Sequence, residues 1–271
     1  MSLRFIIENQ HASAVVSATS EALPASYTRD SRRAYAWRST GTASQTISAT
    51  PVAAVSANGL AIVRHNLSAG ATVRLQLKLN GATVYDSAAL AVGEPIPAGV
   101  WRAGIDAYGA TYNELLDPQI FNHWFTVTHF DEYLIIIDDP SNLAGFLQIG
   151  QIFIGQAFEP RYNMSFGLQL EWLEQTEHLR SDAGSLRSEG TQAKHRRLHL
   201  GLDWLDPGDR TSLTVGFFAA GKGADIFVSA YPEAGGMLEI EHAFVGRRRD
   251  DLGFTHPFHN NWQTRLVFDE A

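Results

Sequence analysis

The feature that most constrains the fold of this chain is an alternation of apolar and polar residues with a period of two. Side chains of a β-strand point alternately to the two faces of the sheet, so this period is typical of a strand with one buried face. It runs through residues 73–79, 197–204, 238–244 and 264–268. The Asn80–Gly81 pair after the first of these segments favours a type I′ turn and predicts a hairpin with residues 82–85.

A continuous apolar run also indicates a strand. Residues 133–137 read Tyr-Leu-Ile-Ile-Ile and are closed by Asp138, Asp139 and Pro140, which predicts a strand buried on both faces. Convincing helical periodicity is absent, although residues 117–124 leave room for one or two helical turns. The aromatic content of 11%, with 23 Gly and 10 Pro, also favours strands and tight turns. We therefore predict an all-β fold.

Composition excludes several classes of protein. Charged residues make up only 18% of the 271 positions and hydrophobic residues 45%, which opposes a disordered chain, a coiled coil or a helical repeat. The formal net charge of −8 leaves no basic surplus for phosphate contacts, so nucleic-acid binding is not expected. The absence of cysteine excludes disulfides, cysteine-ligated zinc, iron–sulfur clusters and cysteine nucleophiles.

The basic residues are unevenly divided, with 18 Arg and only 3 Lys. Arginine suits protein interfaces because its planar guanidinium is weakly hydrated and makes forked contacts. A GC-rich coding sequence would produce the same bias. At the start of the chain, Arg4 and Glu8 bracket only three apolar residues, and no apolar run approaches 18 residues. We expect neither a signal peptide nor a membrane span.

The chain divides near residues 158–161, where the alternating pattern stops and then restarts with Ser165. This predicts two domains, residues 1–157 and 158–271, and we expect the first to fold alone. The polar stretch 180–194 is expected to be a mobile loop, because it is too polar for a core and too long for an ordinary turn. Trypsin should cut there first.

Several passages of the first half share a pattern with a known module. They are Leu23–Arg33 leading to Ala36–Ser39, Gly59 through the His65-Asn66-Leu67 turn into the next strand, Tyr133–Asn142, and Phe146–Gly155. Over about residues 3–157 the chain resembles the galactose-binding-domain-like jelly rolls of structural proteins in tailed bacteriophages. The second half resembles, more diffusely, the C-terminal β-domains that follow this module in phage tail-tip proteins.

The resemblance implies a jelly-roll β-sandwich followed by a second antiparallel β-domain. It also implies a virion structural protein of a phage tail tip or baseplate, similar to distal tail proteins, made in the host cytoplasm. Its expected partners are further copies of itself in a ring, and tail-tube, hub or fibre proteins. The alternative is an adhesin that binds host-surface glycans.

The chemical motifs do not favour an enzyme. Residues 216–223 approach a phosphate-binding loop, but Gly223 stands where the loop needs a hydroxyl, and a strand pattern follows where it needs a helix. We interpret Gly221–Gly223 as a hairpin turn. The acidic pair Glu239 and Glu241 alternates with apolar residues and is expected on the wet side of a strand. No serine nucleophile signature is present.

Two clusters could hold a metal ion. His195 and His199 lie four residues apart, and His256 and His259 could complete a four-imidazole site if the two segments paired. Lys194, Arg196 and Arg197 surround the first pair with positive charge, which opposes a cation. Asp138, Asp139 and Asn142 could supply oxygen ligands to Ca²⁺. The Asp-Pro-Asn turn of the resembled module explains the same residues without an ion. We expect no required metal or cofactor.

Aromatic residues of the first half could form a sugar platform. Trp101, Arg102, Tyr108 and Tyr112 are the candidate glycan-binding residues, with Trp124 nearby in sequence. Tryptophan and tyrosine faces suit pyranose rings. The same residue types are enriched in subunit interfaces or can pack beneath loops, so both interpretations stay open.

Overall fold

A computed structural model describes residues 2–68, 70–92 and 120–271. It divides into two compact units. Unit 1 comprises Leu3–Glu159 and Ile226–Phe244, and unit 2 comprises Pro160–Asp225 and Val245–Ala271. The sequence pattern predicts one boundary, after residue 157, and gives no sign that residues 226–244 return to the first unit.

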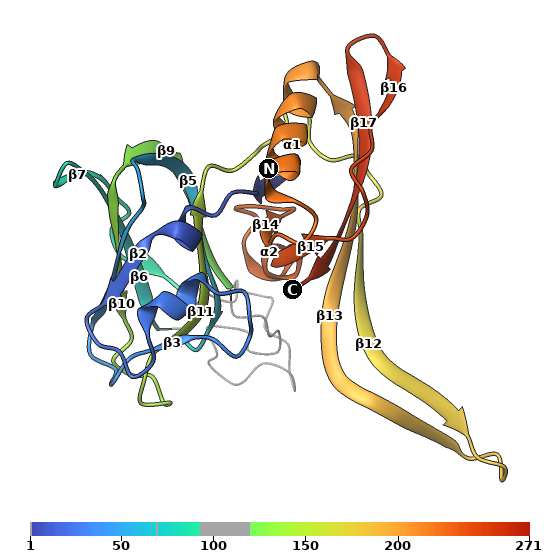
Figure 1. The fold of residues 1–271 in the computed structure, drawn as a ribbon. Helices are drawn as coiled ribbons and strands as arrows, with labels where there is room; N and C mark the ends of the chain where they lie inside the picture. The colour runs from blue at the N-terminus through green and yellow to red at the C-terminus, as the bar shows by residue number, and fades with distance from the viewer. Residues whose placement is uncertain (1, 69, 93–119) are drawn as a thin grey trace, which may run out of the picture. The chain divides into compact units, whose positions relative to one another are not determined.

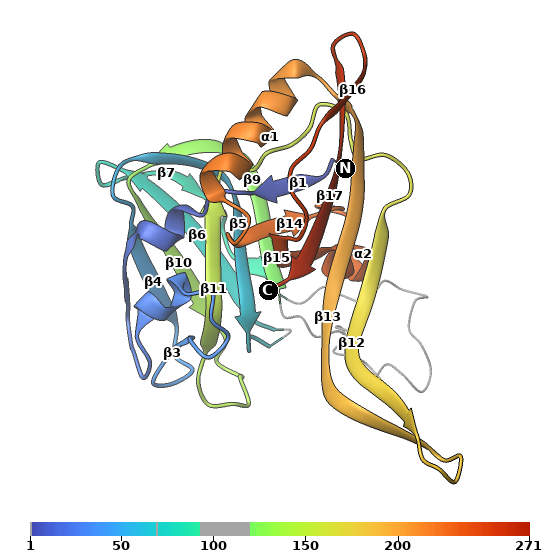
Figure 2. The same ribbon diagram turned by 45° about the vertical axis from the view of Figure 1, so that its right-hand side comes forward.

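Unit 1 is a sandwich of two antiparallel sheets (Figures 1 and 2). One sheet has the order β2-β4-β10-β6-β7, with β8 on β6, and the other has the order β3-β11-β5-β9. The strands of the first sheet are β2 (Val15–Ala18), β4 (Gln45–Thr50), β6 (Thr72–Leu79), β7 (Ala82–Asp86), β8 (Leu90–Ala91) and β10 (Glu132–Asp138). Those of the second are β3 (Trp37–Arg38), β5 (Val55–His65), β9 (Ile120–Phe130) and β11 (Gln148–Gly155). Two short 3-10 helices, η1 (Gln10–Ser13) and η2 (Ala25–Arg29), lie between β1 and β3 in the chain.

The apolar faces of the two sheets form one core, and the alternating sequence pattern explains why. On β6, Val73, Leu75 and Leu77 are fully buried, whereas the residues between them are half-buried. At the predicted hairpin, Asn80 and Gly81 have φ values of 51° and 80°, the positive values of a type I′ turn. These strand and turn predictions, and that of a β protein with an N-terminal jelly roll, are confirmed.

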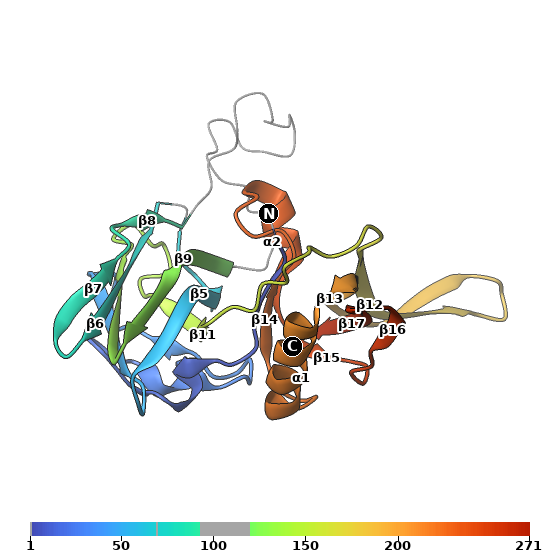
Figure 3. The same cartoon turned by 90° about the horizontal axis from the view of Figure 1, so that it is seen from above.

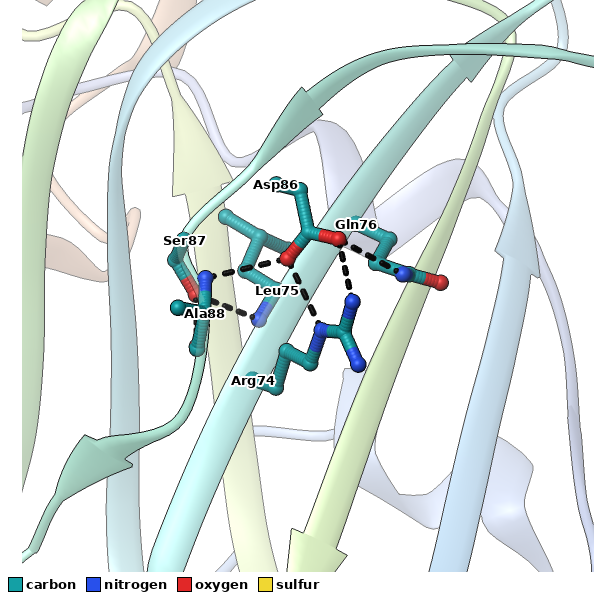
Figure 4. A network of polar contacts seen from close by, with 6 residues as sticks. All are labelled: Arg74, Leu75, Gln76, Asp86, Ser87 and Ala88. Atoms are coloured by element: carbon teal, nitrogen blue, oxygen red, sulfur yellow. Dashed lines mark hydrogen bonds and ion pairs between the residues drawn. The ribbon is translucent and has the colours of Figure 1, made fainter.

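Polar contacts hold the β6–β7 edge together (Figure 4). The Asp86 carboxylate accepts hydrogen bonds from the Arg74 guanidinium, from Gln76 Nε2 at 2.9 Å and from the Ala88 backbone N–H at 3.0 Å. The hydrogen bonds from Arg74 are the main reason that the pKa of Asp86 is held well below its usual range. Ser87 Oγ accepts a hydrogen bond from the Leu75 N–H at 2.9 Å, which continues the connection along β6.

A late segment of the chain completes unit 1. Strand β14 (Ile226–Ser229) pairs with β1 (Arg4–Ile6), and helix α2 (Gly236–His242) follows it. Ile226, Phe227 and Val228 are fully buried. The Phe227 ring lies 6.2 Å from the ring of Trp124 on β9 and 6.3 Å from that of Phe153 on β11.

Unit 2 is a smaller antiparallel sheet covered by one helix. Its strands are β12 (Gln169–Arg180), β13 (Leu186–Leu205), β17 (Asn261–Glu270), the Gly246–Arg248 part of β15 (Ala243–Arg248), and β16 (Thr255–Phe258) on β17. Helix α1 (Pro207–Ala220) buries Leu213 and Phe217, and the Phe217 ring lies 6.3 Å from that of Phe268 on β17.

Both α-helices differ from the sequence prediction. The strand expected at residues 238–244 is largely α2, and Gly221–Gly223 is not a hairpin turn, because Gly221 ends α1 with a φ of 76°. Asp206 caps the start of α1 by accepting a hydrogen bond from Asp209 N, and Pro207 occupies its first turn. In α1, apolar residues such as Phe217 and Phe218 follow one another directly, so the sequence does not show the 3.6-residue spacing of apolar residues by which a helix is recognised.

Two smaller expectations are also corrected. Where one or two helical turns were expected in residues 117–124, the described part is strand from Ile120 onward. The run 133–137 is fully buried on one face only, because Leu134 and Ile136 are half-buried. Among the described residues, no helix has the length and apolar character needed to cross a membrane.

Candidate assembly surface

The four candidate glycan-binding residues, Trp101, Arg102, Tyr108 and Tyr112, lie outside the described residues. β8, the last described strand before these residues, ends at the same edge of the sandwich at which β9, the first strand after them, begins. Ala91 at the end of β8 pairs with Thr72, and Ile120 at the start of β9 pairs with Val63. The β5–β6 loop and the β10–β11 loop lie at this same end of the sandwich.

Trp124 is a packing residue and not part of a sugar platform. It is 9% exposed, and its ring lies against Phe227. The Arg4 guanidinium lies 5.1 Å from the centre of the indole. A Cβ at Gly59 would come within 2.5 Å of the ring, so the glycine is needed to admit it. This part of the aromatic hypothesis is wrong.

The proposed calcium ligands are engaged by hydrogen-bond donors. Asp139 is fully buried. Its carboxylate accepts from Ser68 N at 2.8 Å, Ser68 Oγ at 2.6 Å and Asn142 Nδ2 at 2.8 Å. These contacts tie the β5–β6 loop to the β10–β11 loop and explain Asp139 and Asn142 without an ion.

The histidines and acidic pairs of the sequence analysis have separate surroundings. His199 Nε2 lies 3.6 Å from the Glu171 carboxylate, whereas His256 stacks on Trp262 at 4.2 Å between ring centres. Glu239 lies on α2 instead of a strand and accepts a hydrogen bond from Asn122 Nδ2 at 2.9 Å. Within the described ranges, no three His, Asp or Glu side chains gather as a metal site would require.

Among the described residues, exposed aromatic side chains are concentrated in unit 2. The large apolar residues exposed on the described part of unit 1 are all aliphatic: Val15, Leu23, Val52, Val84, Val127, Leu143 and Leu238. Unit 2 exposes six aromatic residues: Tyr162, Phe166, Trp172, Trp204, Phe218 and Phe258. Aromatic residues in such positions are characteristic of protein interfaces.

One group of aromatic residues surrounds an arginine. Arg210 on α1 lies 4.6 Å from the ring centre of Trp262 and 5.7 Å from that of Phe254. His256 stacks on the same Trp262, and the exposed Phe258 ends strand β16. We call Arg210, Phe254, His256 and Trp262, together with Phe258 two residues after His256 on β16, the Arg210 cluster. It lies at the end of the sheet where Leu205 of β13 pairs with Trp262 of β17.

The opposite end of the sheet is a long hairpin of β12 and β13. β17 pairs with β13 only from Arg197 onward, so residues 186–196 continue with β12 as their only partner strand. At about 3.3 Å per residue, this extension is roughly 35 Å long. All three views show the hairpin running past the end of β17 (Figures 1, 2 and 3).

The outer part of this hairpin, Thr176–Gly190, is called the arm below. Every residue from Glu177 to Gly190 is exposed apart from the half-buried Ser181. The register shifts at its base, where Glu174 pairs with Lys194 but Thr176 pairs with Gly190. The expected loop at 180–194 is therefore wrong in its secondary structure: only residues 181–185 form a turn, and the rest of the polar stretch pairs as strands.

The base of the hairpin is held by a buried arginine. Arg196 is fully buried, and its guanidinium and backbone N–H donate to the Glu270 carboxylate, with Nη2 at 2.8 Å from Oε1. Its guanidinium also lies 5.7 Å from the Trp172 ring centre on β12. β12, β13 and β17 are thus joined at the point where the extension begins.

Comparisons with known proteins give structural likenesses of low similarity. No protein-family model matches the sequence, and no curated protein matches it. A family 32 carbohydrate-binding module of C. perfringens NanJ, solved with galactose, is 18% identical and aligns over 56% of this chain and 98% of its own, with a TM-score of 0.39. A second Clostridium perfringens module, solved with GalNAc-β-1,3-galactose, is 10% identical over 55% and 99%, with a TM-score of 0.37. A chitosan-binding module from Paenibacillus sp. IK-5 is 13% identical over 54% and 98%, with the same TM-score.

Proposed function

We propose that this chain is a non-enzymatic structural protein that assembles into a homo-oligomer, with unit 2 as its assembly module. The observation that carries the proposal is the arm, a two-stranded hairpin that β17 no longer supports. An isolated two-stranded hairpin is at best marginally stable in water, so a protein that keeps one this long gains its order from a partner. The six exposed aromatic residues of the same unit supply apolar surface for such a partner.

We further propose that the assembly belongs to the tail tip or baseplate of a bacteriophage particle. The resemblance of residues 3–157 to the jelly rolls of phage structural proteins supports this location. Mass spectrometry of purified particles tests it, because a virion component must be present in them at a fixed ratio to the other tail proteins. Absence of the chain from the particles would refute the location but not the assembly.

Removing the arm is expected to abolish self-association. In the variant, Asn-Gly replaces residues 175–193, so that Glu174 and Lys194 still close a hairpin through a type I′ turn. The full chain should form oligomers at micromolar concentration, and the variant should be monomeric and still unfold cooperatively, with a melting temperature that does not depend on protein concentration. Sedimentation velocity at several concentrations measures the difference. Val127→Ser, at an exposed aliphatic residue of unit 1, is the matched control and should assemble normally.

Limited digestion with trypsin gives a second test of whether the arm lies in the interface between copies. Arg180 and Arg187 are exposed on the arm, so the free monomer should be cut there first. The assembled protein should be protected at both residues. Equal cleavage in monomer and oligomer would show that the arm lies outside the interface, and a full chain that stays monomeric at all concentrations would refute the assembly itself.

Glycan binding by the jelly roll is the second candidate function. The observation that favours it is that β8 ends at Ala91 and β9 begins at Ile120 at the same loop end of the sandwich, with Trp101 and Tyr108 between these two residues in the sequence. Trp101→Ala and Tyr108→Ala should each reduce binding to a glycan array at least tenfold without changing assembly. Trp204→Ala, an exposed tryptophan of unit 2, is the control and should leave glycan binding intact. An array with no bound glycan would exclude this candidate.

A further inference from the structure

The arm and the Arg210 cluster lie at opposite ends of one strand. β13 begins at Leu186 in the arm and ends at Leu205, which pairs with Trp262 of the cluster. β13 has twenty residues, of which about three are taken up by its two register shifts, so at about 3.3 Å per residue the two ends lie roughly 55 Å apart along the strand. The arm of a given copy therefore cannot reach its own cluster, and only another molecule can contact it.

One face of the arm has unpaired carboxylates. Glu177 pairs directly with Glu189, and the next pair on that face is Leu179 with Arg187. Like charges placed opposite each other destabilise an antiparallel pair. Neither glutamate has a hydrogen-bond or ion-pair partner in the described part of the chain, and Leu179 is 47% exposed beside them. The one cation of this face, Arg187, is outnumbered by the two glutamates, so the face can accept a further cation, and an apolar surface against Leu179.

The Arg210 cluster offers both. The Arg210 guanidinium lies over the Trp262 and Phe254 rings, and its Nε is buried. The Arg210 guanidinium forms no ion pair with any of the described residues. The guanidinium of Arg161, by contrast, lies 3.7 Å from the Asp206 carboxylate. Arg210 is half-buried, so its Nη N–H groups are those left for a carboxylate of another molecule, and their forked geometry suits a bidentate contact. Phe258 is 67% exposed and supplies the apolar surface.

We infer that the arm of one copy binds the Arg210 cluster of the next copy, with Glu177 and Glu189 facing Arg210 and Leu179 facing Phe258. The partner is a second copy of this chain because both complementary surfaces are on it, at ends that cannot meet within one molecule. The contact is head-to-tail, so repeating it builds a closed ring or a filament and not an isolated dimer. This inference rests on the self-assembly proposed above and specifies its surfaces.

Cysteine cross-linking tests the contact cleanly, since the chain contains no cysteine. The double variant Leu179→Cys/Phe258→Cys, treated with a short bismaleimide, should give a ladder of dimers, trimers and higher oligomers on a denaturing gel. An equimolar mixture of the two single variants carries one thiol per chain, so its products should stop at the dimer. Phe218→Cys, at an exposed residue of α1, paired with Leu179→Cys is the matched control and should give no ladder.

Charge exchange provides a second measurement. Glu177→Arg/Glu189→Arg should weaken self-association at least tenfold, and so should Arg210→Glu. Mixing the two variants should restore both contacts, because each arm then meets a cluster of opposite charge, and it should give oligomers in which the two variants alternate. Cross-linking of Leu179→Cys alone as efficiently as the pair would overturn the inference in favour of arm-to-arm contacts. Oligomers that form without the ladder would also overturn it while leaving the proposed function standing, whereas a monomeric full chain would refute both.

Discussion

Lowering the pH from 7 to 5 is expected to destabilise unit 1 by about 4 kcal/mol, because two buried histidines must stay neutral in the folded state. His11 is fully buried at the contact between η1, η2 and β10. The Tyr133 hydroxyl donates to its Nδ1, and its Nε2 lies 2.7 Å from Thr28 Oγ1. Burial, with a smaller contribution from the Arg29 charge, lowers the pKa of His11 to about 3.

His65, at the end of β5, acts in the same direction. Its Nδ1 accepts a hydrogen bond from Leu67 N at 3.2 Å, and burial lowers its pKa to about 4 although Asp139 opposes the shift. An unfolded chain protonates both residues near pH 6.5. The unfolded state therefore binds protons first, and stability falls from pH 6.5 downward until the folded pKa values are reached. At pH 5, about 1.5 units below 6.5, each histidine costs about 2 kcal/mol.

Urea unfolding between pH 7 and pH 4 measures this effect. His11→Gln and His65→Gln should each be less stable than the wild type at pH 7 but should lose less stability on acidification. The double variant should have the flattest profile. His178→Gln, in the exposed arm, is the control and should keep the wild-type slope. A double variant with the full wild-type slope would show that other groups cause the acid sensitivity.

A fragment of residues 1–157 is expected to be largely unfolded, contrary to the expectation from sequence. It lacks β14, whose Ile226, Phe227 and Val228 are fully buried in unit 1. Burying an aliphatic or aromatic side chain contributes about 1.5–3 kcal/mol, so the three together contribute about 5–9 kcal/mol. That approaches the whole stability of a typical domain, about 5–15 kcal/mol. The fragment would also leave the backbone of β1 without its partner strand.

Restoring the missing strand should restore the fold. A chimera that joins residues 3–159 to residues 226–244 through a flexible Gly/Ser linker contains all of unit 1. It should unfold cooperatively, whereas residues 1–157 should show a weak, broad transition by circular dichroism. Phe227→Asp in the chimera is the matched control and should reproduce the behaviour of the short fragment. Cooperative unfolding of residues 1–157 with the same midpoint would contradict the assignment of β14 to unit 1.

The sequence by itself determined the strands whose pattern is local. Val73, Leu75 and Leu77 alternate with polar residues, and a strand with that pattern has one face to bury whatever it packs against. Asn80 and Gly81 determine their turn through backbone preferences alone. The resemblance of the first half added the jelly-roll architecture. None of these features depends on residues far away in the chain.

Only the tertiary structure decided which distant segments meet. Nothing near Phe227 indicates that it packs on Trp124, more than 100 positions earlier, so the return of β14 to unit 1 could not be predicted. The same holds for Asp139, whose local sequence suits an ion but whose partner is Ser68.

The polar stretch 180–194 is the clearest case, because polarity shows only that a segment is exposed and does not distinguish a loop from a hairpin. Its state depends on pairing between residues that lie up to about 20 positions apart, a choice made by cross-strand hydrogen bonds. How far the arm projects depends on where β17 stops pairing with β13. That pairing joins residues some 70 positions apart in the sequence. Such long-range contacts leave no local period in the sequence, and they are what place the arm and the Arg210 cluster at opposite ends of unit 2.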